Sequence, residues 1–129
     1  MVEDDSGGVW IGTYTSGILR VVDDKIYPIL NRDGGLASNE VRALLFDHKQ
    51  RLWAGTASGL TRIETDGSIT QFTTDEGLPG DFIMALSQDA NGNIWVGTGV
   101  GVAMFNDSLG KFKGQQFPRK FNAEYAFGF

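Results

Sequence analysis

Short apolar segments, separated by turns rich in Gly, Asp, Asn and Ser, recur along the whole chain and predict many short strands. Two of these segments, Leu52-Trp53-Ala54 and Ile94-Trp95-Val96, are apolar at every position. A strand without alternation is buried on both faces, whereas an open antiparallel sheet keeps one polar face. The segment Ile69–Thr73 alternates instead, as a partly exposed strand does. The pattern therefore predicts sheets that stack on one another at their middle strands and are more exposed to solvent at their outer strands.

One sequence unit occurs three times. Gly35–Asp47 matches Gly77–Asp89 without a gap, at a constant offset of 42 residues, and the match continues through a Trp-x-Gly-Thr motif. A further copy of that motif opens the chain at Trp10. An aspartate stands six residues before each tryptophan, at Asp4, Asp47 and Asp89. The middle copy reads as four strands, which we expect at Val41–Phe46, Leu52–Thr56, Leu60–Glu64 and Ile69–Thr73.

A four-stranded antiparallel meander of about 40 residues is one blade of a β-propeller. We therefore predict an all-β chain of about three propeller blades: a partial blade at 1–34, blades at 35–76 and 77–118, and a tail at 119–129 as a candidate innermost strand of a further blade. The remaining strands are expected near Val9–Thr13, Phe82–Gln88, Ile94–Thr98 and Val102–Asn106. Propellers close with about four to eight blades, so three blades imply either a fragment of a longer chain or self-association, for example a head-to-tail dimer with six blades.

The repeated Trp-x-Gly-Thr motif has a structural interpretation. Each tryptophan lies in an expected second strand that is covered on both sides, so we predict that it wedges between adjacent blades. The glycine two residues later is expected to leave room for the neighbouring sheet. The tryptophans are therefore predicted to be core residues and not a platform for stacking sugars.

The middle copy matches the pattern G-L-x-S-N-x-V-x-x-L-x-x-D-x-x-x-x-L-W-x-G-T-x-x-G-L-x-R, from Gly35 to Arg62. This pattern resembles the two-component regulator propeller repeat, which is found in periplasmic sensor regions of hybrid histidine kinases and some diguanylate cyclases. The third copy departs from it at Gly80-Asp81 and Ala103-Met104. The resemblance implies a ligand-sensing or binding module in the periplasm, carried by an inner-membrane signalling protein, with a small molecule or an oligosaccharide as ligand.

Composition excludes several classes of partner. The net charge is −5 and no cluster of Lys and Arg offsets it, so we expect no nucleic-acid partner. The chain has no apolar run long enough to span a bilayer, and we expect no direct membrane contact. Cysteine is absent, which excludes thiol chemistry and disulfides. The 18 glycines fit a chain with many turns.

Catalytic and metal-binding groups are few. Asp89–Asn93 has oxygen side chains at alternate positions, as a calcium loop does, but its sister segment Asp47–Arg51 carries cations there. An Asx-type turn is the better interpretation of both. His48 is the only histidine, so a histidine metal cluster is impossible. We therefore expect no metal, no cofactor and no enzyme activity. The alternatives are an enzyme resembling streptogramin lyases and a structural protein-interaction propeller.

The loops indicate where a ligand would bind. Turns after each second strand and crossovers between blades are expected on one face of the propeller, and the short regular turns that carry His48 and Lys49 on the other. Candidate ligand-binding residues on the first of these faces are Tyr14, Asn39, Glu40, Arg42, Asp81 and Phe82.

Overall fold

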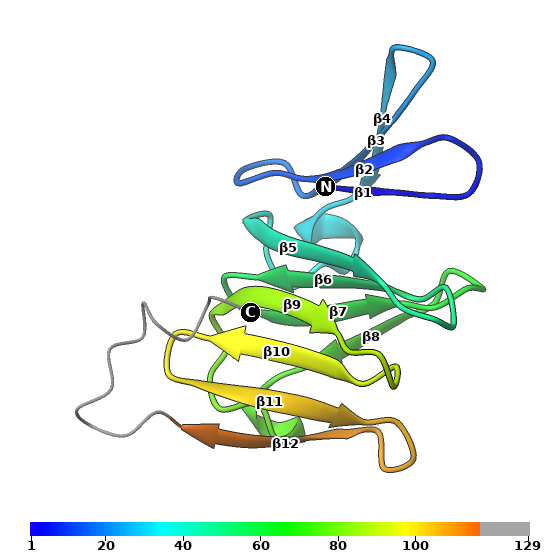
Figure 1. Ribbon diagram of the computed structural model, residues 1–129. Helices are drawn as coiled ribbons and strands as arrows, with labels where there is room; N and C mark the ends of the chain where they lie inside the picture. The colour runs from blue at the N-terminus through cyan, green and yellow to red at the C-terminus, as the bar shows by residue number, and fades with distance from the viewer. Residues whose placement is uncertain (117–129) are drawn as a thin grey trace.

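The computed structural model describes residues 1–116, which form three four-stranded antiparallel sheets and no α-helix (Figure 1). The sheets follow one another in chain order, each as a simple meander, and they are called blades 1, 2 and 3 below. This arrangement confirms the all-β propeller prediction. The predicted further strand at 119–129, and the last two residues assigned to blade 77–118, lie outside the described residues.

Blade 1 contains β1 (Val2–Glu3), β2 (Val9–Gly12), β3 (Ile18–Val22) and β4 (Lys25–Leu30). Its innermost strand pairs with β2 at only two positions. A two-residue turn joins β3 to β4, and both of its residues, Asp23 and Asp24, have positive φ, as a type I′ hairpin turn requires.

Blade 2 contains β5 (Val41–Phe46), β6 (Leu52–Thr56), β7 (Gly59–Ile63) and β8 (Ile69–Phe72). Every residue of β6 is buried, which confirms that the unbroken apolar segment around Trp53 is covered on both faces. Strand β8 is partly exposed, as its alternation predicts.

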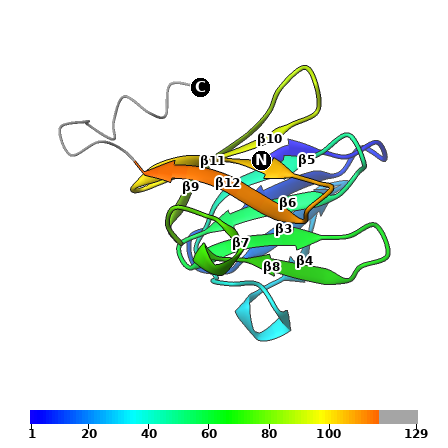
Figure 2. The same ribbon diagram turned by 90° about the horizontal axis from the view of Figure 1, so that it is seen from below.

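Blade 3 contains β9 (Ile83–Gln88), β10 (Ile94–Thr98), β11 (Gly101–Asn106) and β12 (Lys111–Gln116). It packs against blade 2 with β9 beside β5 and β6, and Figures 1 and 2 show the two sheets stacked. The predicted strands agree with the observed ones to within a residue at their ends.

The crossovers between blades contain two 3-10 helices, η1 (Arg32–Gly34) and η2 (Thr74–Glu76), which were not predicted from the sequence. The side chains of Asn31 and Thr73 cap these turns at their start. Each turn ends on a glycine with positive φ, Gly35 or Gly77. The two crossovers therefore have the same local conformation where they connect one blade to the next.

The seam between blades 2 and 3 is built around Trp53, which is 0% exposed. Its ring stacks on Phe72 of its own blade at 5.5 Å between centroids. It also meets the edges of two rings of blade 3, Phe105 at 5.0 Å and Phe112 at 6.1 Å. Aromatic pairs in these geometries add to the hydrophobic stabilisation from burial. The prediction that this tryptophan wedges between blades is confirmed.

The glycine of the Trp-x-Gly-Thr motif is required by the close approach of the next blade. A Cβ atom at Gly55 would lie 2.5 Å from Cγ2 of Ile83 in blade 3. A Cβ atom at Gly12 would lie 2.5 Å from Cγ1 of Val41 in blade 2. Both separations are far inside van der Waals contact, so any larger residue would force the blades apart.

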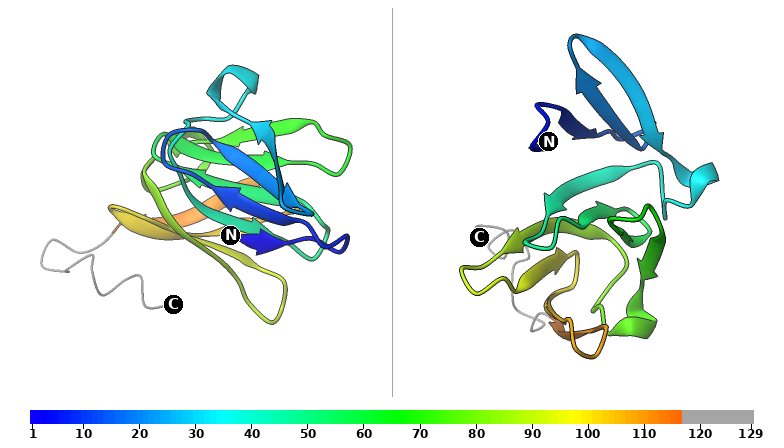
Figure 3. Two further views of the ribbon diagram at one scale, coloured as in Figure 1. Left: turned by 90° about the horizontal axis from the view of Figure 1, so that it is seen from above. Right: turned by 90° about the vertical axis from the view of Figure 1, so that its right-hand side faces the viewer.

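The seam between blades 1 and 2 is more open. Trp10 packs edge-on against Phe46 at 5.6 Å, but it stays partly exposed. The hairpin of β3 and β4 diverges from blade 2 (Figures 1 and 3). Tyr27 and Ile29 on that hairpin are 47% and 38% exposed. Blade 2 presents Ile63 and Ile69 at the register positions where blade 3 has Phe105 and Phe112, and these smaller side chains fill less of the seam.

The difference in burial between Trp53 and Trp95 predicts that replacing each by alanine lowers the free energy of unfolding by a different amount. Trp53→Ala should lower the free energy of unfolding by about 3–5 kcal/mol, because it removes a fully buried aromatic side chain and leaves a cavity. Trp95→Ala, at the corresponding position of blade 3, should cost clearly less, because Trp95 is only partly buried within residues 1–116. Urea unfolding followed by circular dichroism measures both. Equal costs for the two variants would contradict the described seam.

Candidate ligand-binding face

The turns after each second strand and the crossovers meet on one face of the blades, here called the crossover face. Three backbone hydrogen bonds join them: Gly17 N–H to Asn39 O, Ala57 N–H to Glu40 O and Gly99 N–H to Phe82 O. The predicted common position of these loops is therefore observed. The turns that join first to second strands, and third to fourth strands, lie on the opposite face, here called the hairpin face.

Four of the six candidate residues form a cluster on the crossover face. The guanidinium carbon of Arg42 lies 5.2 Å from the ring centroid of Tyr14 and 5.0 Å from that of Phe82. Nη1 of Arg42 donates to Oε2 of Glu40 at 3.0 Å. Tyr14 comes from blade 1, Glu40 and Arg42 from the start of blade 2, and Phe82 from the start of blade 3, so three blades contribute to one cluster.

This cluster is accessible. Tyr14 is 66% exposed and Phe82 is 40% exposed. The side chain of Arg42 is 28% exposed, and among the described residues its guanidinium has no hydrogen-bond partner besides Glu40. Several N–H groups of Arg42 are therefore available next to a carboxylate and two aromatic rings.

The other two candidates, Asn39 and Asp81, hold the crossovers in shape. Oδ1 of Asn39 accepts from the backbone N–H of Arg32 at 2.7 Å. Oδ1 of Asp81 accepts from the backbone N–H of Thr74 at 3.2 Å. These are equivalent bonds in successive repeats, and neither side chain joins the Arg42 cluster.

The repeated aspartate has a role that its spacing alone did not reveal. In each blade its Oδ2 accepts from the indole Nε1 of the tryptophan six residues later, at 2.7 Å for Asp4 and Asp47 and 3.0 Å for Asp89. Its Oδ1 accepts two backbone N–H groups of the turn between, for Asp89 those of Asn91 and Asn93, at 2.9 Å each. This geometry agrees with the predicted Asx-type turn. No group of metal-ligating side chains occurs within residues 1–116.

Each aspartate also accepts from one further side chain, and that donor differs between blades. In blade 1 it is Nε of Arg20 at 2.7 Å, in blade 2 Nε of Arg51 at 2.7 Å, and in blade 3 Nδ2 of Asn93 at 3.1 Å. Burial alone would raise the pKa of Asp47, but the hydrogen bonds from Trp53 and Arg51 outweigh burial and lower it. The carboxylate is therefore kept ionised at the seam.

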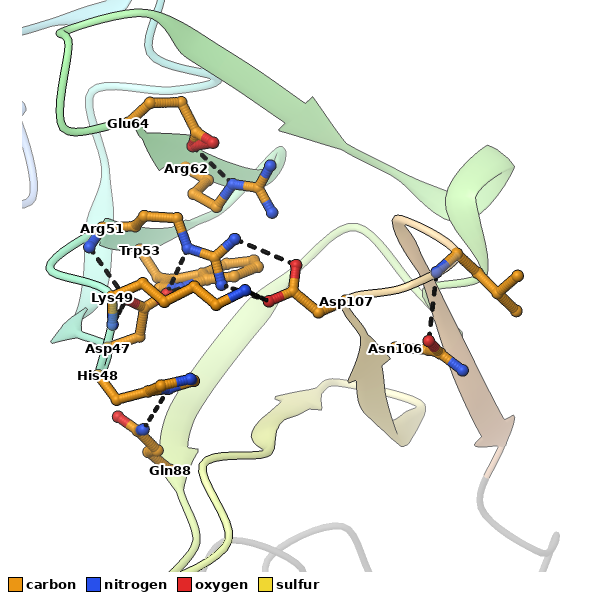
Figure 4. A network of polar contacts seen from close by, with 11 residues as sticks. Asp47, His48, Lys49, Arg51, Trp53, Arg62, Glu64, Gln88, Asn106 and Asp107 are labelled. Atoms are coloured by element: carbon orange, nitrogen blue, oxygen red, sulfur yellow. Dashed lines mark hydrogen bonds and ion pairs between the residues drawn. The ribbon is translucent and has the colours of Figure 1, made fainter.

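A polar network closes the hairpin face of the seam between blades 2 and 3 (Figure 4). Asp107 of blade 3 accepts from Lys49 Nζ at 2.6 Å and from Arg51 Nη1 and Nη2 at 3.2 and 3.1 Å. His48 Nδ1 lies 3.0 Å from Nε2 of Gln88. A cleft of about 350 Å³ lies beside this network, on the face opposite the predicted ligand-binding face. Nothing in the repeat pattern marks Asp107 as the partner of Arg51.

The chain matches a known repeat family over its second and third units. The profile of the two-component regulator propeller family covers residues 35–58 and 77–99. These segments are two-component regulator propeller repeats. A search of curated proteins finds no match. No helix within residues 1–116 has the length and apolar character needed to cross a membrane.

Solved structures share the fold of this chain. The extracellular domain of BT3049 from B. thetaiotaomicron, assigned to a hybrid two-component system, is 30% identical with a TM-score of 0.78, over 89% of this chain and 16% of that one. A virginiamycin B lyase from Staphylococcus aureus, catalytically inactive and solved with quinupristin, is 25% identical with a TM-score of 0.67, over 92% of this chain and 41% of that one. The extracellular domain of BT4673 shares the fold, at 22% identity and a TM-score of 0.77, over 93% of this chain and 18% of that one. The chain thus spans about a sixth of the BT3049 domain.

The paired carboxylates predict how stability depends on pH. Hydrogen bonds from Arg51 and Lys49 lower the pKa of Asp107 to about 2, and those from Trp95 and Asn93 lower the pKa of Asp89 to about 2. As pH falls, the unfolded chain takes up these protons before the folded protein does. The free energy of unfolding should therefore be highest above about pH 4 and fall as the pH approaches about 2.

Urea unfolding at a series of pH values measures this loss. Asp107→Asn should reduce the stability at neutral pH and flatten the acid limb of the curve, because one of the carboxyls with a lowered pKa is gone. An acid limb of unchanged steepness in this variant would contradict a role of the Asp107 network in the folded protein.

Proposed function

We propose that this chain is part of an extracytoplasmic sensor region of a membrane-bound signalling protein, and that it binds an oligosaccharide at the Arg42 cluster. Two observations support the sensor assignment: the family of the repeats and the similarity to the extracellular domain of BT3049. The observation that supports the binding position is the convergence of Tyr14, Arg42 and Phe82 from three blades.

The chemistry of the cluster suits a neutral polyol. The unpaired N–H groups of Arg42 donate hydrogen bonds and the carboxylate of Glu40 accepts them, so neighbouring hydroxyl groups of a sugar find one partner each. The exposed ring of Tyr14 offers an apolar surface for the face of a sugar ring. The net charge of −5 disfavours an anionic ligand, because the summed field of the protein repels it.

The enzyme alternative receives less support from the site. An acid–base mechanism needs a titratable group within hydrogen-bond reach of the reacting atoms. The one histidine, His48, lies on the hairpin face beside Gln88, away from the Arg42 cluster. Glu40 on the crossover face is paired with Arg42. The lyase similarity therefore supports a shared fold and not a shared reaction.

Substitution at the cluster tests the binding position. Isothermal titration calorimetry with a panel of cello-, xylo-, malto- and fructo-oligosaccharides should identify at least one that binds the unchanged chain. Arg42→Ala should weaken that binding at least roughly tenfold, which is the effect of losing a charged hydrogen-bond donor. The variant should keep its fold, because Arg42 lies outside the apolar seams.

Lys49→Ala is the matched control, since it removes a cation on the opposite face and should leave oligosaccharide binding unchanged. A ligand that binds the Arg42 variant as well as the unchanged chain would place the site elsewhere. Failure of every oligosaccharide in the panel to bind would contradict the proposed ligand class.

A further inference from the structure

The innermost strands of blades 2 and 3 each contain a β-bulge at the same position. Arg42 lies between two residues of β5 whose partners are adjacent on β6, so it is one residue more than the pairing needs. Met84 lies in the same way between two residues of β9 whose partners are adjacent on β10. A β-bulge interrupts the regular alternation of a strand and changes the direction of the extra side chain. In both blades the extra residue is the second of its strand, close to the crossover that leads into it.

The residue before each bulge is held in the seam between two blades. Cγ1 of Val41 occupies the space that a Cβ atom at Gly12 of blade 1 would need. Cγ2 of Ile83 occupies the equivalent space beside Gly55 of blade 2. Both of these β-branched residues belong to the apolar clusters of the seams, and neither bulge residue does. The packing of the blades therefore constrains the residue before the bulge and leaves the chemistry of the bulge residue free to vary.

The bulge position stays accessible when blades lie on both sides of it. Arg42 belongs to blade 2, which has blades 1 and 3 as its neighbours, and its side chain is still 28% exposed. Met84 is 37% exposed in blade 3, which has blade 2 as its neighbour within residues 1–116. Because the two positions are equivalent, a blade that follows blade 3 in a longer chain would leave Met84 open at the crossover face.

The two blades carry different chemistry at the positions around the bulge. At three crossover-face positions the side chains of blade 2 are polar and those of blade 3, 42 residues later, are apolar: Glu40, Arg42 and Ser58 against Phe82, Met84 and Val100. All three apolar side chains of blade 3 are exposed. Single exposed apolar residues are ordinary on a protein surface, whereas several at one place indicate a binding surface.

The three apolar residues of blade 3 lie together. The backbone N–H of Gly99 donates to the carbonyl of Phe82 at 3.2 Å, which holds the turn that carries Val100 against the crossover. Cγ2 of Val100 lies over Gly80 of that crossover, 2.8 Å from where a Cβ atom would be. Met84 follows Phe82 by two residues. The three residues are called the Met84 subsite below.

The Met84 subsite borders the Arg42 cluster, because the guanidinium carbon of Arg42 lies 5.0 Å from the ring centroid of Phe82. One small ligand can therefore contact polar groups of blade 2 and apolar groups of blade 3. Thioether and aromatic side chains make favourable contacts with an aromatic ring. We propose that Met84 determines specificity at this face, by forming an apolar subsite for an aromatic substituent of the oligosaccharide that Arg42 and Glu40 hold. The inference rests on the proposed function, since the Arg42 cluster must bind the sugar.

Matched ligands test the proposal by isothermal titration calorimetry. Each oligosaccharide that binds the chain is compared with derivatives that carry one aromatic ring, as a 4-nitrophenyl glycoside or as a monobenzoyl ester. At least one derivative should bind about tenfold more tightly than the unsubstituted sugar, a gain that needs only part of an aromatic ring to leave water. The ring is at the reducing end in one derivative and on a hydroxyl group in the other, so the tighter ligand shows where the substituent lies.

Substitution of the bulge residue tests its role in this preference. Met84→Ser should bring the ratio of the two dissociation constants close to one, because it removes the apolar side chain. Met84→Leu should keep the preference, since leucine restores an apolar side chain of similar volume. Leu109→Ser is the matched control: it removes an exposed apolar side chain on the hairpin face of the same blade, and the ratio should not change. Circular dichroism verifies that each variant folds.

The outcomes separate this inference from the proposed function. Equal affinities for substituted and unsubstituted sugars would overturn the inference, and so would a preference that Met84→Ser leaves intact. In either case the proposed function stands if Arg42→Ala still weakens binding of the unsubstituted sugar. Failure of every ligand to bind, substituted or not, would contradict the proposed function and this inference together.

Discussion

The blade seams depend on one repeated hydrogen bond, from the indole N–H of each motif tryptophan to the aspartate six residues before it. An indole ring can pack between two sheets only if its orientation is held and its N–H has a partner. The carboxylate of Asp47 supplies that partner while it also accepts from two backbone N–H groups of the turn that follows it. One buried charge therefore shapes the turn, orients the ring and positions the next blade. Arg51 neutralises the charge from within the same turn.

The seams differ because the residues around this common element differ. Blade 3 brings Phe105 and Phe112 to Trp53 and covers it completely, whereas the corresponding side chains at the first seam are smaller and leave Trp10 partly exposed. The ion pair between Arg51 and Asp107 also joins blades 2 and 3 at the edge of the second seam. The first two blades are therefore joined mainly at their inner strands, and the second and third along most of their width.

The candidate site exists because of this stacking. Tyr14, Arg42 and Phe82 come from three successive blades, and their rings and guanidinium meet only when both seams are formed. Hydrogen bonds from the backbone of the 3-10 turns to Asn39 and Asp81 fix the shape of the crossovers, which lead into the first strands of blades 2 and 3. Because the cluster joins residues of three blades, a change in the angle between blades would alter its geometry, and this agrees with the proposed sensing function.

The blade as a unit, its four strands and the buried tryptophan could be predicted from the sequence, because a repeat with period 42 and unbroken apolar second strands is compatible with few other folds. The sequence also placed the crossover face, since a meander alternates its turns between two ends. It did not reveal the 3-10 turns, the hydrogen bond from indole to carboxylate, or the link from Arg51 to Asp107. Nor did it show which candidate residues form one cluster and which cap a loop. Those contacts join residues from different strands or blades, and the distance between such residues depends on how the sheets pack and not on their separation along the chain.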